Sequence, residues 1–599
     1  MGAAIFYLSG ISPERHNASG SKSRSRDARR RDASRTGSRS AARRRERRER
    51  GRRRVAWLAL PLLLILIGGA GFAVYRLTRS PDLRATARRF VTAWTHDRYG
   101  QMYALLDARS RRALSEQQFA AELQAAARTA TLASTQPLRL LAIHHGLARE
   151  SIAVHTRVFG SFDELLRIPL QVSGTTAGVR FSSSLLFPGL SGGQSLSRQA
   201  LLGQRGSLLT ANGQLLASGS TLASALPQVA AELVGTLGPI PKAQMASYEA
   251  QGYPPDARVG QDGLEQIFQA RLAGRPGGEL LAGRRVLARV APVNGSTVRT
   301  TVDPTLEQDA ISALGGRYAG VTVLDPSTGA IRAAAGIAFT GLQPPGSTFK
   351  IITSAAALQA GLTTLNTTYP VHRSVIIDGF RLHNAAGESC GGTLLNAFAV
   401  SCDTTFAPLG VQIGAARLVA MAQRFGFDAP SGIPNVMIGT IPSAAAIGGP
   451  VAIGASAIGQ GVVQATTLGM ADAAATIANG GERPLPSFDQ QAPPRFVHVT
   501  SPTIAGEIQQ MMEAVVRYGT GTQAQIPGVT VAGKTGTAEL VNTFGKRNDT
   551  KGVDAWFVAY APVPNPKVVV CALFPNAGYG GATAAPVVRQ LLVDALQGA

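Results

Sequence analysis

An uncharged stretch of 21 residues, Val55 to Tyr75, constrains most strongly how this 599-residue chain can fold. As a helix it would be about 31 Å long, which matches the hydrocarbon thickness of a bilayer. The preceding residues 1–54 contain 17 Arg, one Lys and five acidic residues, a net charge of +13. Because positively charged flanks stay in the cytoplasm, the pattern predicts a transmembrane anchor over 55–77. The N-terminus is then cytoplasmic and the rest of the chain extracytoplasmic.

A cleavable signal peptide is the alternative for this segment. The apolar run is longer than a signal peptide requires, and no small-x-small cleavage site follows it, so we favour an uncleaved anchor. Residues 1–54 have few apolar side chains and are predicted to be a disordered basic tail. Their charge would also suit nucleic acid, but the neighbouring anchor explains it more simply, and we expect no nucleic-acid partner.

The extracytoplasmic part divides into three regions by pattern. Residues 80–130 have helical periodicity and 138–186 alternate as strands do, which predicts a small α+β domain over 80–190. Over 196–300 we expect a mostly β module, with a hairpin turning at Asn212-Gly213. We also expect a short helix there, from Gly263 to the glycine at 274.

The third region, 301–599, begins and ends with strands. "AGVTVLDPSTGAIRAAAG" predicts two strands around a turn at 326–329, and "VDAWFVAYAPVPNPKVVVCALFP" predicts another pair near the end. Long helical and Ala/Gly-rich stretches lie between them, and a final helix is expected over 584–596. This order is typical of an α/β sandwich whose sheet is completed by the late strands.

Lysine is rare in this chain, which has seven Lys against 52 Arg. One of them, Lys350, follows Ser347 by three residues at the start of an apolar helix that we expect to end at Gly361. Residues three apart share a helix face, so the hydroxyl and the amine can meet. A buried lysine loses charge stabilisation and can take the serine proton, whereas arginine cannot. The pattern is loose, however, because Ser19–Lys22 matches it by chance.

Two later motifs make the catalytic interpretation more specific. "VSCDTTF" supplies Ser401 and Asp403, and "VAGKTGTAEL" supplies Lys534, followed by Thr535, Gly536 and Thr537. A serine–lysine pair, a second serine and then K-T-G is the order found in penicillin-interacting serine enzymes.

These motifs make the chain resemble the class B penicillin-binding proteins, over nearly all of 80–599. "PPGSTFK", "SCD", "IGQGVVQATTLGMA", "IANGG" and "GKTGTAE" carry the resemblance, together with "RGSLLTANGQLLA" and "GLEQIFQARLAG" before them. It implies a multidomain protein with one N-terminal transmembrane helix. Residues 80–190 resemble the nuclear transport factor-like, cone-shaped α+β domain of the methicillin-resistance type, which does not itself imply resistance. A mostly β pedestal (dimerisation) domain over 196–300 and an α/β, β-lactamase-like penicillin-binding transpeptidase domain over 301–599 would follow.

The resemblance also implies roles for the motif residues. Ser347 would attack the penultimate carbonyl of a peptidoglycan stem peptide ending in D-Ala-D-Ala, with Lys350 as its general base. Ser401, with Lys534, would relay a proton to the departing D-Ala. An amine from a neighbouring strand would then resolve the acyl-enzyme and form the cross-link, and β-lactams would acylate the same serine.

The remaining motif residues would bind substrate. The N–H groups of Ser347 and Thr537 would form an oxyanion hole, and Thr535 with Lys534 would hold the terminal carboxylate; Asp403 and Gly536 complete the predicted set. No metal or organic cofactor is implied. Expected partners are stem peptides, β-lactams, the plasma membrane and, by resemblance, a membrane glycan polymerase.

Position 403 departs from the family pattern, which usually has Asn there. An ionised Asp403 can accept hydrogen bonds but not donate them, and it would raise the pKa of Lys350. A catalytically weak or inactive scaffold in a cell-wall complex therefore stays open beside the transpeptidase. A β-lactamase or a penicillin sensor, which would use the same chemistry, also stays open.

Other patterns are less specific. "GVTVAGKT" (528–535) fits a phosphate loop and "LSGGQ" (190–194) fits an ATPase signature, but their order and context disfavour an ATPase. Cys390 and Cys402 could form a disulfide or remain two buried thiols. We interpret Cys571 as a core residue and the pair at 144–145 as ordinary histidines without metal-ligand spacing.

Overall fold

The computed structural model describes residues 81–539 and 552–598. The tail predicted over 1–54 and the anchor predicted over 55–77 lie outside the described residues. Within these ranges no single helix is long and apolar enough to cross a bilayer. One pair of consecutive helices, α13 (Asp403–Ile413) and α14 (Ala415–Arg424), is long and apolar enough when taken together, but the two helices are bent by 101° relative to each other.

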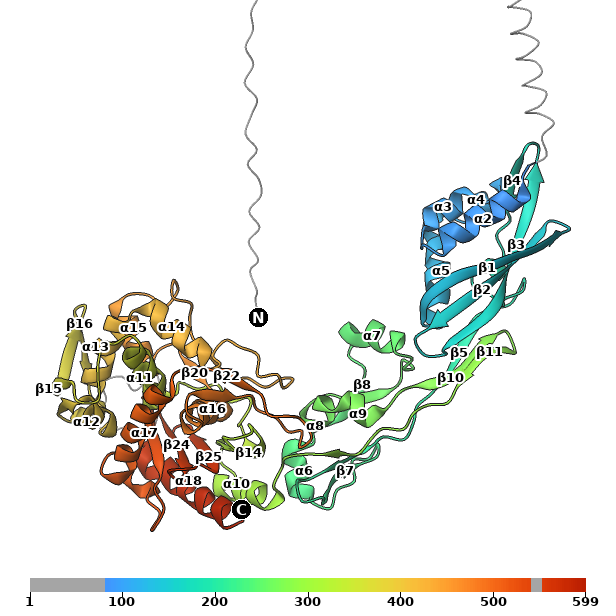
Figure 1. The fold of residues 1–599 in the computed structure, drawn as a ribbon. Coiled ribbons are helices and arrows are strands. Elements are labelled where there is room, and N and C mark those ends of the chain that lie inside the picture. Colours follow the sequence, from blue (N-terminus) through green and yellow to red (C-terminus); the bar gives the residue numbers. More distant parts are fainter. Residues whose placement is uncertain (1–80, 540–551, 599) are drawn as a thin grey trace, which may run out of the picture. The chain divides into compact units, whose positions relative to one another are not determined.

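The first described domain has helices packed on a four-stranded antiparallel sheet of order β1-β2-β3-β4 (Figure 1). Its fourth helix begins with a capping box, in which Ser115 and Gln118 bond each other's backbone N–H groups. The elements are α2 (Leu83–Trp94), α3 (Tyr99–Ala104), α4 (Ala108–Ala113), α5 (Glu116–Thr129), β1 (Leu132–His144), β2 (Leu147–Thr156), β3 (Ser161–Ser173), β4 (Thr176–Val179) and η1 (Ser183–Leu185).

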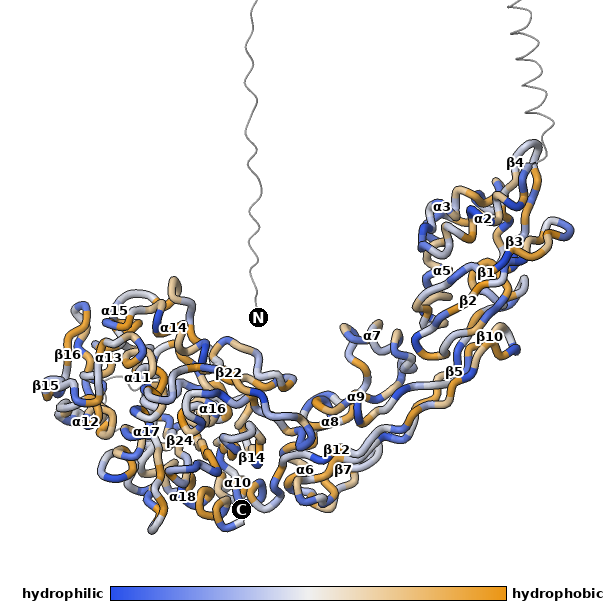
Figure 2. The backbone as a smooth tube through the Cα atoms, in the orientation of Figure 1, coloured by the Kyte–Doolittle hydropathy of each residue, from blue (hydrophilic) through white to orange (hydrophobic). Residues whose placement is uncertain are grey.

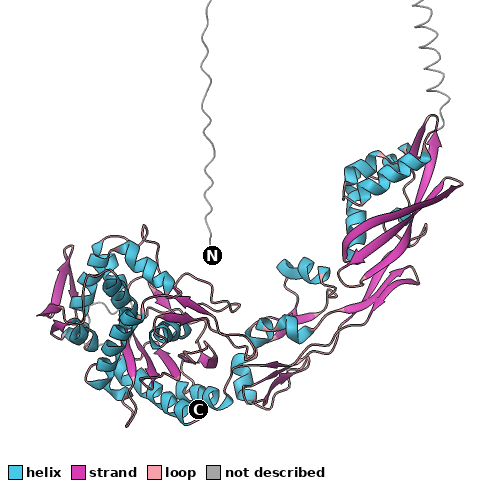
Figure 3. Cartoon of the chain, in the orientation of Figure 1, coloured by secondary structure: helices cyan, strands magenta, loops and turns pink. Residues whose placement is uncertain are grey.

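The second region consists of small sheets and short helices (Figure 3). The predicted hairpin is β6–β7, and Gly213 in its turn has a φ of +87°. The predicted single helix over 263–274 is instead two short ones, because Phe268 leaves helical geometry (φ −103°, ψ 14°). The elements are β5 (Leu196–Leu201), β6 (Ser207–Leu209), β7 (Leu215–Ser218), α6 (Pro227–Leu233), β8 (Leu237–Pro239), η2 (Lys242–Gln244), α7 (Met245–Ala250), β9 (Arg258–Gly260), α8 (Gly263–Ile267), α9 (Gln269–Ala273), β10 (Gly277–Ala282), β11 (Arg285–Val290) and β12 (Val298–Arg299).

A five-stranded antiparallel sheet organises the third region, in the order β14-β13-β25-β24-β23. Strands from both ends of the region pair in it, as the sequence predicts. Both faces are covered, so β24 and β25 are buried at every position and consist largely of apolar residues (Figure 2). The strands are β13 (Gly320–Leu324), β14 (Ile331–Gly336), β23 (Ala532–Glu539), β24 (Val553–Ala561) and β25 (Val568–Phe574).

Helices α10 and α18 cover one face of this sheet, and α16 contacts the other. The final helix begins at Gly580, four residues before the predicted start. The helices are α10 (Pro304–Leu314), η3 (Gly346–Phe349), α11 (Lys350–Gln359), η4 (Ala385–Gly387), α12 (Leu394–Ala399), α13 (Asp403–Ile413), α14 (Ala415–Arg424), α15 (Pro450–Ala457), α16 (Thr467–Ala478), α17 (Pro502–Arg517), η5 (Thr522–Ala524) and α18 (Gly580–Gln597). Short paired strands between them are β15 (Thr368–His372), β16 (Ser374–Ile377), β17 (Phe380–His383), β18 (Cys390–Thr393), β19 (Gly439–Thr440), β20 (Gln464–Ala465), β21 (Glu482–Pro484) and β22 (Phe496–His498).

Candidate active site

Ser347 lies on the 3-10 turn η3, which leads directly into α11. The preceding Gly346 has a φ of +52°, and its N–H donates to the Gly459 carbonyl at 2.9 Å. A Cβ on Gly346 would lie 2.9 Å from the Thr537 carbonyl oxygen, so this close approach requires glycine. Ser347 is 8% exposed, and among the described residues its hydroxyl makes no hydrogen bond. Within the described part of the chain the hydroxyl is therefore not held by a neighbouring polar group.

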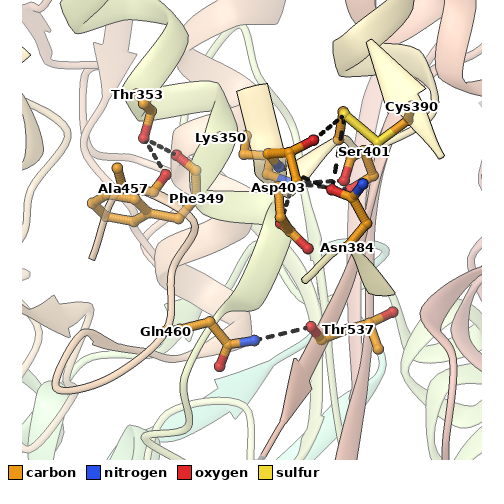
Figure 4. A network of polar contacts seen from close by, with 12 residues as sticks. Phe349, Lys350, Thr353, Asn384, Cys390, Ser401, Asp403, Ala457, Gln460 and Thr537 are labelled. Atoms are coloured by element: carbon orange, nitrogen blue, oxygen red, sulfur yellow. Dashed lines mark hydrogen bonds and ion pairs between the residues drawn. A yellow bond between two sulfur atoms is a disulfide. The ribbon is translucent and has the colours of Figure 1, made fainter. Parts of the chain in front are cut away.

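The Lys350 side chain is completely buried, and its amine contacts the second motif (Figure 4). Its Nζ lies 2.7 Å from Asp403 Oδ1, 2.7 Å from the Ser401 carbonyl oxygen and 3.4 Å from Ser401 Oγ. Within the described residues it makes no hydrogen bond to Ser347, although the sequence predicts that the two groups can meet. Burial lowers the pKa of Lys350, and the carboxylate of Asp403 opposes this by favouring the charged amine.

Ser401 occupies the turn between α12 and α13 and has a φ of +61°. A non-glycine residue in this region costs about 1–3 kcal/mol and needs support from its surroundings. The conformation directs the Ser401 hydroxyl to Lys534, whose Nζ donates to Oγ at 2.8 Å. The neighbouring Cys402 is bonded to Cys390 by a disulfide, which decides between the two possibilities that the sequence leaves open.

Lys534 is the second buried lysine of the site and lies within β23. Besides Ser401 Oγ, its Nζ donates to the Thr535 carbonyl at 3.0 Å. Burial lowers the pKa of Lys534 well below its usual value, and the charge of Lys350 lowers it further. Each lysine lies 5.4 Å from an aromatic ring, Lys350 from Phe406 and Lys534 from Phe398. Of the two amines, only that of Lys350 has a carboxylate partner at hydrogen-bond distance within the described residues.

Gly536 allows β23 to lie against the segment that carries Ser347. A Cβ at this position would come within 2.7 Å of the Pro345 carbonyl oxygen and of Trp556 Cβ, and within 3.0 Å of Thr348 Cγ2. The space beside Gly536 is therefore occupied by the protein's own residues. The sequence analysis instead predicted that Gly536 binds substrate. Its role in substrate binding stays a prediction.

The two threonines of the third motif contact other elements. The Thr535 hydroxyl is 2.6 Å from that of Thr520, and the Thr537 carbonyl accepts a hydrogen bond from Gln460 Nε2 at 3.3 Å (Figure 4). Gln460 belongs to the loop after α15 that also contacts Gly346. The segment that carries Ser347 therefore lies between this loop on one side and β23 on the other.

Four of the predicted polar residues form one hydrogen-bonded network. Lys350 lies on α11, Ser401 on the turn between α12 and α13, Asp403 on α13 and Lys534 on β23. Ser401 links the two lysines through its carbonyl and hydroxyl, and Asp403 joins the network through Lys350. Two buried amines, one carboxylate and a bridging hydroxyl can hold and move a proton three residues from Ser347. This arrangement suits nucleophilic acyl transfer.

Sequence reasoning missed two groups at the site. The side-chain oxygen of Asn384 accepts a hydrogen bond from the Thr404 N–H at the start of α13. Glu539 lies at the end of β23, and its pKa is raised by burial and by the charge of Asp403. "KTGTAE" included Glu539 as a motif letter without a role, and nothing periodic marks Asn384. Among residues 81–539 and 552–598, no group of three or more His, Cys, Asp or Glu could hold a metal ion.

The phosphate-loop interpretation does not fit this geometry. Such a loop connects a buried strand to a helix N-terminus, but Lys534 and Thr535 lie inside β23 and pair with Val558 and Phe557 of β24. The segment at 190–194 lies in turns after η1. The structure therefore excludes this ATPase interpretation.

Two family models match the chain. A penicillin-binding protein dimerisation domain matches residues 223–300, and a penicillin-binding protein transpeptidase domain matches 319–593. A similar curated protein, the peptidoglycan D,D-transpeptidase PbpA of Mycolicibacterium smegmatis, is 33% identical over 402 residues. The aligned part covers 56% of this chain and 79% of that protein.

Solved structures of penicillin-binding proteins are also similar to this chain. The crystal structure of PBPA from Mycobacterium tuberculosis is 28% identical with a TM-score of 0.53, covering 66% of this chain and 99% of that one. A ceftriaxone acyl-enzyme complex of penicillin-binding protein A from the same organism is 26% identical with a TM-score of 0.52, covering 66% and 98%.

Proposed function

Because the chain belongs to the class B penicillin-binding proteins, we propose that it is a serine-type peptidoglycan D,D-transpeptidase that β-lactams inhibit covalently. The substrate is a stem peptide ending in D-Ala-D-Ala, and the product is a cross-link between two strands with release of D-Ala.

In the acylation step, Ser347 Oγ attacks the penultimate carbonyl carbon. Its proton passes to Lys350, which must be neutral at that moment. The backbone N–H groups of Ser347 and Thr537 stabilise the oxyanion. Thr535 and Lys534 hold the terminal carboxylate of the substrate.

The scissile C–N bond then breaks, and the proton that Lys350 took from Ser347 passes through Ser401, with Lys534, to the leaving D-Ala amine. An amine of a neighbouring stem peptide attacks the resulting Ser347 ester, and its proton passes through the same groups to Ser347 Oγ as the ester C–O bond breaks, which regenerates the hydroxyl. Asp403 and Gly536 complete the proposed substrate site. No step requires a metal or organic cofactor.

The observation that carries this proposal is the network of Lys350, Ser401, Asp403 and Lys534, which begins three residues after Ser347. Four residues from separate parts of the chain supply a base, a proton relay and an electropositive site. Apart from position 403, where the family usually has Asn, they match the family motifs residue by residue.

The test is mass spectrometry of the full chain after incubation with benzylpenicillin. We expect one stable acyl adduct, located on the peptide that contains Ser347, and no adduct on the Ser347→Ala variant. Incubation with a D-Ala-D-Ala stem peptide and an amine acceptor should release D-Ala and form the cross-linked product.

Other outcomes identify the alternatives. A folded protein without an adduct would indicate a scaffold, an interpretation that the Lys350–Asp403 pair and the missing Ser347–Lys350 hydrogen bond favour. Rapid hydrolysis of the penicillin would indicate a β-lactamase.

The proposal extends to the architecture and location of the chain. We assign 55–77 to a single transmembrane anchor after a basic cytoplasmic tail over 1–54, 80–190 to the nuclear transport factor-like domain, 196–300 to the pedestal and 301–599 to the transpeptidase domain. The catalytic domain then faces the extracytoplasmic wall, where a membrane glycan polymerase would supply the strands. Protease protection in membrane vesicles tests this topology.

A further inference from the structure

A segment outside the three motifs is fastened to the turn that carries Ser401 and Asp403. It consists of the hairpin β16–β17, the turn η4 and the strand β18, with β15 paired to β18. Two attachments join it to the second motif: the disulfide between Cys390 and Cys402, and hydrogen bonds of Asn384 (Figure 4).

The Asn384 side chain uses both of its N–H donors and its acceptor oxygen. Its Nδ2 donates to the carbonyls of His372 at 2.7 Å and Glu388 at 2.9 Å. Its Oδ1 accepts from the backbone N–H of Thr404 at 2.9 Å. The residue is 6% exposed, so water does not compete effectively for these bonds. Asn384 thus joins the chain before the hairpin, at His372, and the chain after it, at Glu388, to the first turn of α13.

The start of α13 needs this support. Its N-cap residue is Cys402, whose side chain does not cap the helix. The first N–H groups of a helix have no partner inside the helix, and Asn384, twenty residues earlier, satisfies one of them. The residues held by the disulfide and by Asn384, 402 and 404, directly flank Asp403.

We propose that Asn384 is a positioning residue for the acylation step, an inference that rests on the proposed function. By holding the Thr404 N–H, it keeps the Asp403 carboxylate against Lys350 and the Ser401 hydroxyl against Lys534. The disulfide fixes the other side of the same turn. Asn384 touches neither substrate nor reacting atoms and acts through this turn.

Loss of the Asn384 side chain should lower the rate constant of acylation more than it weakens the binding of penicillin. When the turn is free to shift, Asp403 contacts Lys350 for less of the time, and the amine loses part of its charge stabilisation. The relay through Ser401 is also misaligned, and a displacement of about 1 Å can cost about 100-fold in rate.

The test measures acylation of the full chain in detergent by a fluorescent penicillin, in stopped flow between pH 5 and 10. For Asn384→Ala we expect the acylation rate constant to fall by about 10- to 100-fold, with a dissociation constant within threefold of wild type. The acid limb of the pH profile should also move to lower pH, because Lys350 is neutral more readily. A general loss of folding would reduce the active fraction without moving this limb.

Asn384→Asp is a second variant of the same shape. It keeps an oxygen for the Thr404 N–H but loses both donated bonds to His372 and Glu388, so we expect a reduced rate constant with little change in penicillin binding. The matched control is Asn396→Ala. Asn396 lies on α12 and its side chain donates to the Gly391 carbonyl at 2.9 Å, and within the described residues that side chain makes no hydrogen bond to residues 401–404. We expect wild-type acylation from it.

The outcomes separate the two proposals. If wild type acquires no adduct at Ser347, the function itself fails. If wild type is acylated and both folded Asn384 variants match it in rate constant and pH profile, the positioning role is wrong. Equal slowing by Asn396→Ala would also overturn it, because the effect would then belong to the whole segment.

Discussion

Two ion pairs are buried among the described residues of the third region, and they differ in the cation. Lys350 lies 2.7 Å from Asp403 at the candidate site, and Arg483 lies 2.9 Å from Asp472 between β21 and α16. Both cations are nearly or fully buried. The Asp472 side chain is completely buried, whereas that of Asp403 is 13% exposed.

The difference shows what each pair can do. A guanidinium keeps its charge at every accessible pH, so the Arg483 pair can only hold structure. A buried lysine can give up its proton, and burial lowers the pKa of Lys350 in that direction. In a chain that uses arginine almost everywhere, the lysine at 350 gives this pair a cation that can change its charge, as the proposed mechanism requires.

Exchanging the cations should give the largest effect. Lys350→Arg should lower the rate of acylation by penicillin about 100- to 10,000-fold, because a general base contributes that much and arginine cannot act as one. Arg483→Lys should leave acylation within threefold of wild type. The measurement is the time course of adduct formation by mass spectrometry, with circular dichroism to verify folding. Substantial acylation by Lys350→Arg would mean that another group, such as Lys534, is the base.

Removing one member of the structural pair should destabilise the protein unequally. Burial raises the pKa of Asp472 to about 7 even beside Arg483. After Arg483→Met the carboxyl can neutralise itself by binding a proton, whereas Asp472→Asn leaves a charge that cannot be lost. We expect Asp472→Asn, which keeps the charged guanidinium buried beside a neutral amide, to cost more than Arg483→Met.

Urea unfolding at pH 5 and pH 8 measures both effects. In wild type the folded pKa of Asp472 lies above its ordinary value of 3.8. The native state therefore holds a proton that the unfolded state has lost, and this contribution to stability falls as pH rises from about 4 to about 7. Asp472→Asn should lack that slope. The double variant Asp472→Leu with Arg483→Met is the control and should be neutral or stabilised by about 1–4 kcal/mol. Equal costs for the two single variants would contradict the asymmetry.

The sequence predicted the parts of the fold that periodicity and turn residues determine. Apolar runs predicted β24 and β25, and glycine turns predicted the hairpins β6–β7 and β13–β14. The break at Phe268 was missed because the residues on both sides continue a helical pattern, while tertiary contacts decide the local geometry.

At the site, motif letters identified the polar groups but not their partners. The predicted approach of Ser347 and Lys350 followed from helix spacing alone, whereas in the structure the carboxylate of Asp403 and the Ser401 carbonyl bind the amine. Asn384 could not be found from sequence, because its contacts reach residues 4 to 20 positions away without any period. The spacing of two cysteines likewise does not determine the distance between their Cα atoms, which is 5.6 Å here.

The smallest expected effect comes from removing the charge of the catalytic pair while keeping its shape. The Asp403 carboxylate raises the pKa of Lys350 against the effect of burial. Asp403→Asn should therefore lower that pKa and make the amine neutral at lower pH. The acid limb of the acylation profile should then move to lower pH.

Lys534 and Glu539 also face this cluster. Glu539→Gln is the matched variant, because it removes a nearby carboxyl without touching Lys350, and it should move the limb less. If Asp403→Asn gives the same profile as wild type, the carboxylate does not set the charge of Lys350. The contrast between the two pairs would then rest on the cation alone, a lysine that burial favours in its neutral form against an arginine that keeps its charge.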